Sequence, residues 1–323
     1  MIKYIVRRLL MMIPILMGIS LIVLIFINLA PGDPARIILG DDASEEEVQT
    51  LRDNFGLNDA FHVRYIRFLS NAIRGDFGRS YLNNRIIRDE MFQRLRYTVV
   101  IAVLSTLIAV VIGVPLGIYA ATHQYTLRDN AAIAISLICV SVPSFWLALL
   151  LVQLFSIKLN WLPIAGVDTW KGWVLPILSL GVGHSAMITR MMRSNLLEVI
   201  SQDYITTARA KGQTEFIVLY RHALKNAIIP IVMIVASMFG MSLGGAMIAE
   251  TIYSVPGVGS YMLSGLTGRD YPVIQATSFF MSMISSFVVL FIDIAFAFID
   301  PRIRSQYTKK RERKKIEVGG TAQ

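Results

Sequence analysis

The chain has 323 residues, of which 54% are hydrophobic and 16% are charged, and its formal net charge is +9. A soluble protein averages about 25% charged residues, so this composition excludes an ordinary water-soluble domain. The single cysteine, Cys139, excludes a disulfide framework or a cysteine-based metal site within this sequence. The basic excess lies at the chain ends and in short loops, where positive charge orients helices in a bilayer, so it does not indicate a nucleic-acid partner.

Long uncharged runs predict six membrane-spanning helices. Crossing about 30 Å of hydrocarbon takes roughly 20 helical residues. Strands of a membrane barrel would instead be about 10 residues of alternating character. We therefore expect an all-α integral membrane protein with six transmembrane helices. The runs, each of 18 residues or more, are 9–32, 97–127, 130–157, 172–189, 226–249 and 271–292.

The first run shares one feature with a cleaved signal peptide, because Lys3, Arg7 and Arg8 precede it. Its 24 uncharged residues nevertheless exceed the usual apolar core of about 7–15 residues, and no small-residue cleavage site follows. We expect an uncleaved span, so that residues 1–30 form the cytoplasmic N-terminus and the first transmembrane helix.

The distribution of basic residues predicts the topology. Segments 190–226 and 300–323 carry six and eight lysines and arginines, whereas loops 158–171 and 250–270 carry only three between them. Positive loops stay in the cytoplasm. We therefore expect both termini there, a permease core over 97–299 and a basic cytoplasmic tail over 300–323.

Residues 31–96 are expected to form a folded helical loop outside the cytoplasm, after the first span. The segment holds ten arginines against eleven acidic residues, and its 66 residues exceed the length of about 60 for which the charge rule holds. Ser44 and Glu47 have the spacing of a capping box, which predicts a helix that Gly56 ends.

Residues 62–74 predict a second helix in this loop, ended by Gly75. Its pattern is amphipathic, which is typical either of packing against the rest of the chain or of a docking surface for an external partner. The apolar stripe consists of Val63, Ile66, Leu69 and Ile73.

The cytoplasmic segment 190–226, between the fourth and fifth spans, is too polar for lipid and too regular for a linker. Residues 203–212 predict a short helix rich in small residues and ended by Gly212. A second helix is predicted from Glu215 to Asn226, running into the fifth span. Small side chains let another surface approach closely, although an ordinary loop with an interfacial basic helix fits the same residues.

Residues 203–230 resemble the coupling loop of ATP-binding-cassette importer permeases, in the variant of the dipeptide, oligopeptide and nickel family. Ala208 and Gly212 match the family spacing, whereas Thr206 and Thr207 replace its glutamate and first alanine, and Pro230 arrives late. Further segments typical of this family occur along the chain in the family's order. The first of these segments, together with the long first loop, is similar to the B-type permease subunit of the family. The segments are Ala30-Pro31-Gly32-Asp33-Pro34, Gly75-Asp76-Phe77-Gly78-Arg79-Ser80, Pro256-Gly257-Val258-Gly259, Arg269-Asp270-Tyr271-Pro272-Val273-Ile274-Gln275 and Asp300-Pro301-Arg302-Ile303-Arg304.

The resemblance implies half of a pathway for peptides or related small solutes across a bacterial or archaeal cell membrane. It implies three kinds of partner: a second homologous permease, two cytoplasmic ATPase subunits that bind ATP and Mg, and an external substrate-binding protein. The sequence lacks a Gly-x-x-x-x-Gly-Lys-Ser/Thr phosphate loop, so we expect no enzyme activity and no cofactor in this chain. The residues implied in coupling to the ATPase are Asp203, Tyr204, Thr206, Thr207, Ala208, Arg209, Ala210, Lys211 and Gly212.

Polar residues within spans are functional candidates. Glu250, at the outer end of the fifth span, is the best candidate to meet a peptide amino group. Asp293 lies near the cytoplasmic side of the sixth span, where pairing with a neighbouring subunit or snorkelling fits equally. His184 is expected to be a packing residue, and Gln153 is a further polar group in the third span.

Small residues in the fifth span predict a close helix approach. Gly240 and Gly244 have the Gly-x-x-x-Gly spacing, and Gly245 follows. We expect them to pack against another helix, to line the pathway, or both.

Two other functions fit a membrane protein of this size. A single-chain secondary transporter would show ionisable residues at mid-membrane and two matching halves. A membrane-embedded enzyme would need paired reactive groups on facing spans, and His184 has no such partner in the sequence pattern. The solute itself cannot be predicted, since permeases of this kind carry dipeptides, longer peptides, glutathione, nickel or metal chelates.

Overall fold

The computed structural model describes residues 2–29, 32–40 and 42–299. The predicted basic tail 300–323 and the segment Asp300–Arg304 lie outside these residues. The described chain is helical, with a single isolated β-bridge between Arg79 and Ile86. Its helices are α1 (Ile2–Leu29), α2 (Pro34–Leu39), α3 (Glu45–Asn54), α4 (Phe61–Ile73), α5 (Ile87–Thr122), α6 (Leu127–Ser141), α7 (Ser144–Leu151), α8 (Trp170–Ile200), α9 (Asp203–Ala210), α10 (Glu215–Ile217), α11 (Leu224–Ile252), α12 (Val258–Thr267) and α13 (Tyr271–Ile299).

Within the described residues, five helices are long and apolar enough to cross a membrane, and one bent pair makes a sixth candidate. The third predicted span, 130–157, is not one straight helix. It bends by 100° between α6 and α7, which continues as a π-helical turn over Val152–Lys158. Val142 adopts an extended conformation (ψ 121°) because Pro143 follows it, and proline disfavours a helical residue before it.

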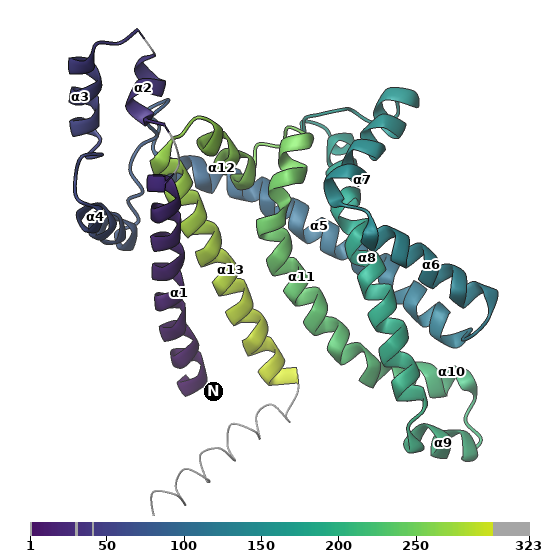
Figure 1. Cartoon of the computed structure of the whole chain (residues 1–323). Helices are drawn as coiled ribbons and strands as arrows, with labels where there is room; N and C mark the ends of the chain where they lie inside the picture. The colour runs from purple at the N-terminus through teal and green to yellow at the C-terminus, as the bar shows by residue number, and fades with distance from the viewer. Residues whose placement is uncertain (1, 30–31, 41, 300–323) are drawn as a thin grey trace, which may run out of the picture.

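The predicted helices of the first loop are confirmed. The Ser44 hydroxyl accepts from the Glu47 N–H, the Glu47 carboxylate accepts from the Ser44 N–H, and α3 ends before Gly56 at φ +64°. Figure 1 shows α2 to α4 grouped together beside α1, on the side away from α8. These three helices therefore form a small unit attached to the membrane-spanning helices.

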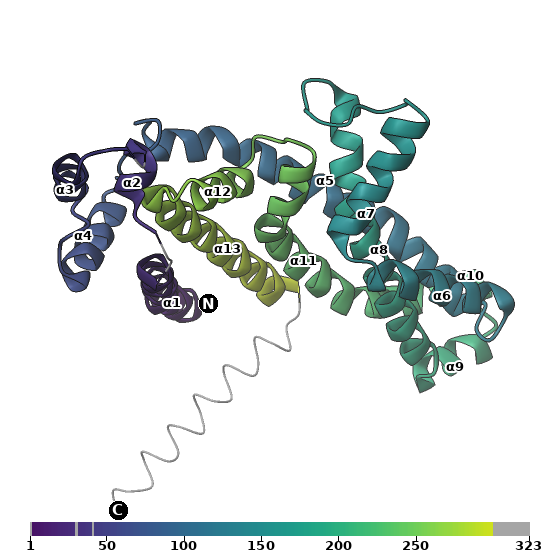
Figure 2. The ribbon, with the colours of Figure 1, turned by 45° about the horizontal axis from the view of Figure 1, so that its top comes forward.

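The centre of the fold is the contact between α5 and α8. Gly113 and Gly117 on α5 lie against backbone and side chains of α8, so that a Cβ at Gly117 would sit 2.5 Å from the Cβ of Met192 and 2.7 Å from the Thr189 carbonyl. The absence of side chains lets the two helices approach closely. In both views α11 lies between α8 and α13, and α13 lies beside α1 (Figures 1 and 2).

Different segments of the chain lie at the two ends of the membrane-spanning helices. The N-terminal end of α1 and the short helix α9 lie at one end, whereas α2 and α12 lie at the other (Figure 1). The predicted coupling segment is therefore at the opposite end from the folded first loop.

Candidate functional site

The candidate site is the turn between α8 and α11, at residues 203–226. Helix α9 spans Asp203–Ala210, and Gly212 follows it at φ +77°, a conformation that residues with side chains rarely adopt. The Gly212 N–H donates to the Arg209 carbonyl at 2.9 Å, which closes the last turn. The prediction of a short helix ended by glycine is confirmed.

Helix α9 has one buried face and one exposed face. Ile205 and Ala208 are buried, at positions three apart on the same side of the helix. On the other side Thr206, Thr207 and Ala210 are exposed. These three side chains are small, so a partner surface can approach the α9 backbone closely at these positions.

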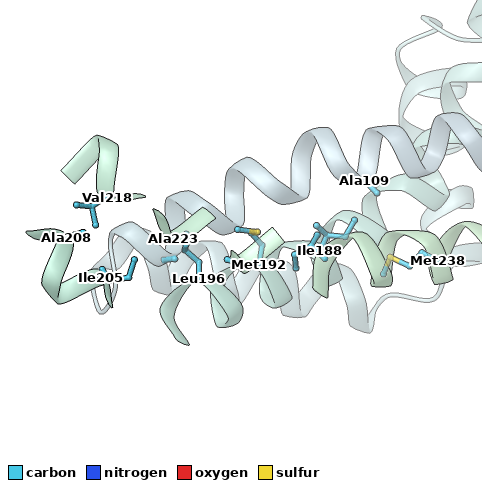
Figure 3. Close-up of a cluster of buried hydrophobic side chains, with 12 residues drawn as sticks. Ala109, Ile188, Met192, Leu196, Ile205, Ala208, Val218, Ala223 and Met238 are labelled. Carbon is cyan, nitrogen blue, oxygen red and sulfur yellow. The ribbon is translucent and has the colours of Figure 1, made fainter. Parts of the chain in front are cut away.

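The buried face of α9 is the end of a continuous apolar cluster. Figure 3 shows Ile205 and Ala208 grouped with Val218, followed by Ala223 and Leu196 and then by Met192 and Ile188 on α8. The same cluster reaches Ala109 on α5 and Met238 on α11 (Figure 3). The cluster therefore joins α9 to three membrane-spanning helices.

Two polar contacts hold α9 against the helix that follows. The Arg209 guanidinium donates to both carboxylate oxygens of Glu215, at 2.7 and 3.2 Å, across the turn at Gly212. This hydrogen-bonded carboxylate raises the pKa of Arg209 above its usual value. The Asn226 amide donates to the Tyr204 hydroxyl at 2.9 Å. These contacts link α9 to the start of the fifth span.

The second predicted helix of this segment is confirmed, and it runs without a break into the fifth span. Between α10 and α11 the chain forms a π-helical turn over Val218–Ala223. Such turns are rare in proteins, and those that occur are frequently found at functional sites. This one lies directly between the α9 turn and the membrane-spanning part of α11.

An ion pair that the sequence analysis did not single out lies near the same end of the fold. Arg193 of α8 donates to both carboxylate oxygens of Asp129 at the start of α6, each at 2.6 Å. Tyr125, in the turn before α6, donates its backbone N–H to the same carboxylate at 3.0 Å. The pair therefore joins the α5–α6 turn to the helix that leads into α9.

At the opposite end of the fold, Glu250 is fully buried within this chain. The Thr98 hydroxyl donates to one of its carboxylate oxygens at 2.5 Å, and the Ser260 N–H donates to the other at 2.8 Å. Thr98 also accepts from the Val258 N–H at 3.0 Å. A Cβ at Gly257 would overlap this carboxylate. The geometry thus joins α5, α11 and α12 through Glu250.

A shallow cavity of about 390 Å³ lies between the C-terminal end of α11 and α12. Its lining includes Glu250 and the hydroxyl-bearing residues Thr251, Ser254, Ser264 and Thr267. Apolar atoms make up most of the cavity surface.

The other residues predicted for the pathway are scattered. Gly240 and Gly244 lie on α11, but a Cβ at Gly244 would meet no atom within 4 Å, so the described chain brings no helix against it. The expected close approach is found instead at Gly113 and Gly117. Gly245 also belongs to α11, Asp293 belongs to α13, and the position of the Asp293 side chain lies outside the described part of the structure.

His184 and Gln153 differ in environment. The Nδ1 atom of His184 is buried, without a hydrogen-bond partner among the described residues, and Gln153 is exposed on the π-helical turn after α7. Neither contacts the 203–226 segment or the Glu250 group through a hydrogen bond in the described structure.

Family models match nearly the whole chain. The model described as "Binding-protein-dependent transport system inner membrane component" matches residues 113–305. A second model, for the N-terminal part of such membrane components, matches residues 1–102.

Curated relatives match this chain over nearly their whole length. The glutathione transport system permease protein GsiC of Escherichia coli K12 is 38% identical over 304 residues, which cover 94% of this chain and 99% of that protein. The protein of the same name from Salmonella paratyphi A is 37% identical over the same coverage.

Among solved structures, two crystal forms of the methionine ABC transporter MetNI in inward-facing conformations have a similar fold. They superpose with TM-scores of 0.57 and 0.55, at 19% identity, over 65% of this chain and 96% of the matched chain. At this identity the likeness concerns the fold alone.

Proposed function

This chain belongs to the family of binding-protein-dependent transport system inner membrane components, and we propose that an ATPase subunit drives it through residues 203–212. It is a permease of an ATP-binding-cassette importer, and its task is to provide a path for a small solute across the membrane. The proposal concerns how this path is opened and what passes through it.

One observation carries the proposal. Helix α9 presents Thr206, Thr207 and Ala210 outward, while Ile205 and Ala208 on its other face belong to the buried cluster that reaches α5, α8 and α11. A partner that moves α9 therefore moves three spans together. Packed helices shift between discrete arrangements rather than deforming gradually, so such a push can switch the pathway between two states.

Within this proposal each residue of the segment has a role. Thr206, Thr207 and Ala210, with Asp203 and Lys211 at the ends, form the surface that the ATPase contacts. Tyr204 and Arg209 hold the helix to Asn226 and Glu215, and Ala208 packs against the core. Gly212 allows the tight turn that returns the chain to the membrane.

The complete importer would contain two ATPase subunits, a second homologous permease and an external substrate-binding protein. The open surface around Gly244 supports a second permease, because this face of α11 lacks a covering helix within the described chain. Met241, one turn earlier, is exposed on the same helix. A homologous subunit packing here would complete the pathway.

The solute is proposed to be a short peptide. The relatives named above belong to a glutathione transport system, and glutathione is itself a peptide. The hydroxyl groups around the outer cavity suit a polar, uncharged contact with such a solute.

We assign α9 and both termini to the cytoplasm. Basic residues concentrate in 190–226 and 300–323, and positive loops remain inside. The start of α1 lies at the same end of the fold as α9, which supports this assignment. Helices α2 to α4 and α12 then lie on the outer side.

Substitution of Gly212 tests the coupling role. Gly212→Val forces a β-branched residue into φ +77°, which costs about 1–2 kcal/mol locally, while the side chain itself meets no neighbour. We expect the importer to assemble and hydrolyse ATP but to lose solute uptake in vesicles. Unchanged uptake per ATP hydrolysed would rule out the assignment.

Gly40→Val is the matched control. Gly40 has φ +88° and also has no atom within 4 Å of its Cβ position, but it ends α2 at the opposite end of the fold. Backbone strain at this positive φ is expected to leave uptake per ATP unchanged. A loss of coupling in both variants would mean that general instability, and not the α9 turn, is responsible.

A further inference from the structure

Helix α4 leaves one edge without a partner among the described residues, and this edge carries Ile66 and Ile73 with the exposed Ser70 between them. The Ile66 and Ile73 side chains are 62% and 87% exposed, and they lie two helical turns apart on one side of α4. The opposite side is occupied, because Tyr65 contacts α1 and Phe68 packs edge-on against Phe279 of α13, with ring centroids 5.7 Å apart.

Two neighbouring side chains locate α4 along α1. The Tyr65 hydroxyl donates to the Met17 carbonyl at 2.7 Å, whereas Arg64 donates to the Asn28 side chain at 2.7 Å, near the end of α1. Met17 and Asn28 are separated by about 16 Å along a helix. The α4 backbone must lie between these two levels, beside the outer half of the span.

The contact between Phe68 and Phe279 of α13 places α4 at the same height along the membrane-spanning helices. Phe279 lies eight residues after Tyr271, the first residue of α13, which is about 12 Å into the span. Figure 1 shows α4 running across the direction of α1 and not parallel to it. An exposed apolar edge at this depth faces hydrocarbon, not water, and an arginine such as Arg64 can extend along α1 toward the headgroups.

A basic pocket lies at the C-terminal end of α4. Arg74, directly after Ile73, lines a cavity of about 380 Å³ together with Arg79 and Arg88, and Asp76 is the only acidic side chain in the lining. All three arginines are exposed. Guanidinium groups bind phosphate oxygens well, because their N–H groups match the geometry of the anion.

We propose that α4 is an in-plane helix of the outer leaflet that binds a phospholipid. Ile66 and Ile73 contact the acyl chains, and Arg74, Arg79 and Arg88 take the phosphate. The acyl and phosphate sites adjoin, as they do in a lipid molecule, since Ile73 and Arg74 are consecutive. The surface also continues the lipid-facing side of α1, where Ile22 and Phe26 are exposed between the levels of Met17 and Asn28.

Spin labels test the acyl contact in the assembled importer. Cys139→Ser removes the only native thiol, and a nitroxide is then attached at Ile66→Cys or Ile73→Cys in nanodiscs of phosphatidylethanolamine and phosphatidylglycerol. We expect high collision rates with oxygen and low rates with a water-soluble nickel chelate, as for Phe26→Cys on α1. Glu46→Cys on the exposed face of α3 provides the water-exposed reference.

Two results would overturn the proposal. Nickel accessibility like that of Glu46→Cys would place the α4 edge in water. Low accessibility to both reagents at both sites would mean that another protein subunit covers the edge.

Loss of the arginines tests the phosphate contact. We expect native mass spectrometry of the detergent-purified importer to detect retained phospholipid, and the Arg74→Gln, Arg88→Gln double variant to lose about tenfold in occupancy, as expected when charge-assisted hydrogen bonds are removed. Arg36→Gln on α2, a half-buried arginine outside the pocket that pairs with Glu45, is the control. Equal occupancy in the double variant and the control would contradict the phosphate site.

Discussion

Arg193 and Asp129, 64 residues apart, face each other through two hydrogen bonds of 2.6 Å. The carboxylate of Asp129 is buried, while the Arg193 side chain is 23% exposed. Because Arg193 lies on α8, seven residues before its end, this pair connects the start of α6 to the helix that enters the α9 turn. The pair thus holds the start of α6 against the part of α8 that precedes α9.

We expect Asp129→Asn to destabilise the permease by about 2 kcal/mol, since it leaves a charged guanidinium without its partner beside the core. Arg193→Lys should lower the stability by a smaller amount, because lysine keeps the positive charge beside Asp129 although it cannot form the two parallel hydrogen bonds. Thermal unfolding of the purified importer measures both. An Asp129→Asn variant as stable as the native protein would show that the pair contributes nothing.

Substitution of Glu250 separates a structural role from a solute contact. Glu250→Ala leaves the Thr98 hydroxyl and the Ser260 N–H without their acceptor in a buried site, which costs about 1–3 kcal/mol. We expect a lower unfolding temperature with unchanged apparent affinity for the solute. Thr98→Val should have a similar effect, and the double variant should lose less than the sum because the two residues share one interaction.

The opposite pattern would support the expectation drawn from the sequence, that Glu250 meets the solute. If Glu250→Ala weakens solute affinity while the unfolding temperature stays the same, Glu250 contacts the solute in another state of the importer.

The close contact between α5 and α8 is possible because Gly117 has no side chain. Gly117→Ala should destabilise the fold by about 1–3 kcal/mol, because its Cβ would press on Met192 and the Thr189 carbonyl. Gly183→Ala on α8 is the control, since no atom lies within 4 Å of its Cβ position and alanine favours a helix. Equal unfolding temperatures for the two variants would contradict this packing.

Local features of the fold could be predicted from the sequence. The capping box at Ser44 and Glu47 and the glycine end of α9 depend on residues a few positions apart, so their physics is complete within a short segment. The bend at Val142–Pro143 was also readable, because a proline constrains the residue before it. The length of the uncharged run 130–157 alone does not reveal this bend.

Contacts between distant residues could not be predicted in this way. Asp129 and Arg193, or Thr98 and Glu250, are 64 and 152 residues apart, and no periodic pattern links them. The Gly-x-x-x-Gly spacing occurs at both Gly113–Gly117 and Gly240–Gly244. The three-dimensional arrangement of the helices places α8 against Gly113 and Gly117, whereas no atom of the described chain lies within 4 Å of a Cβ at Gly244.

The two faces of α9 provide the most direct test of the coupling account. Ala208 and Ala210 are the same residue type, two positions apart, but Ala208 is buried and Ala210 is exposed. In a Cys139→Ser background, Ala210→Cys with a short thiol-directed photo-crosslinker should link this chain to the ATPase subunit, whereas Ala208→Cys should not. An actively transporting Ala210→Cys importer that gives no crosslink to the ATPase would contradict the account.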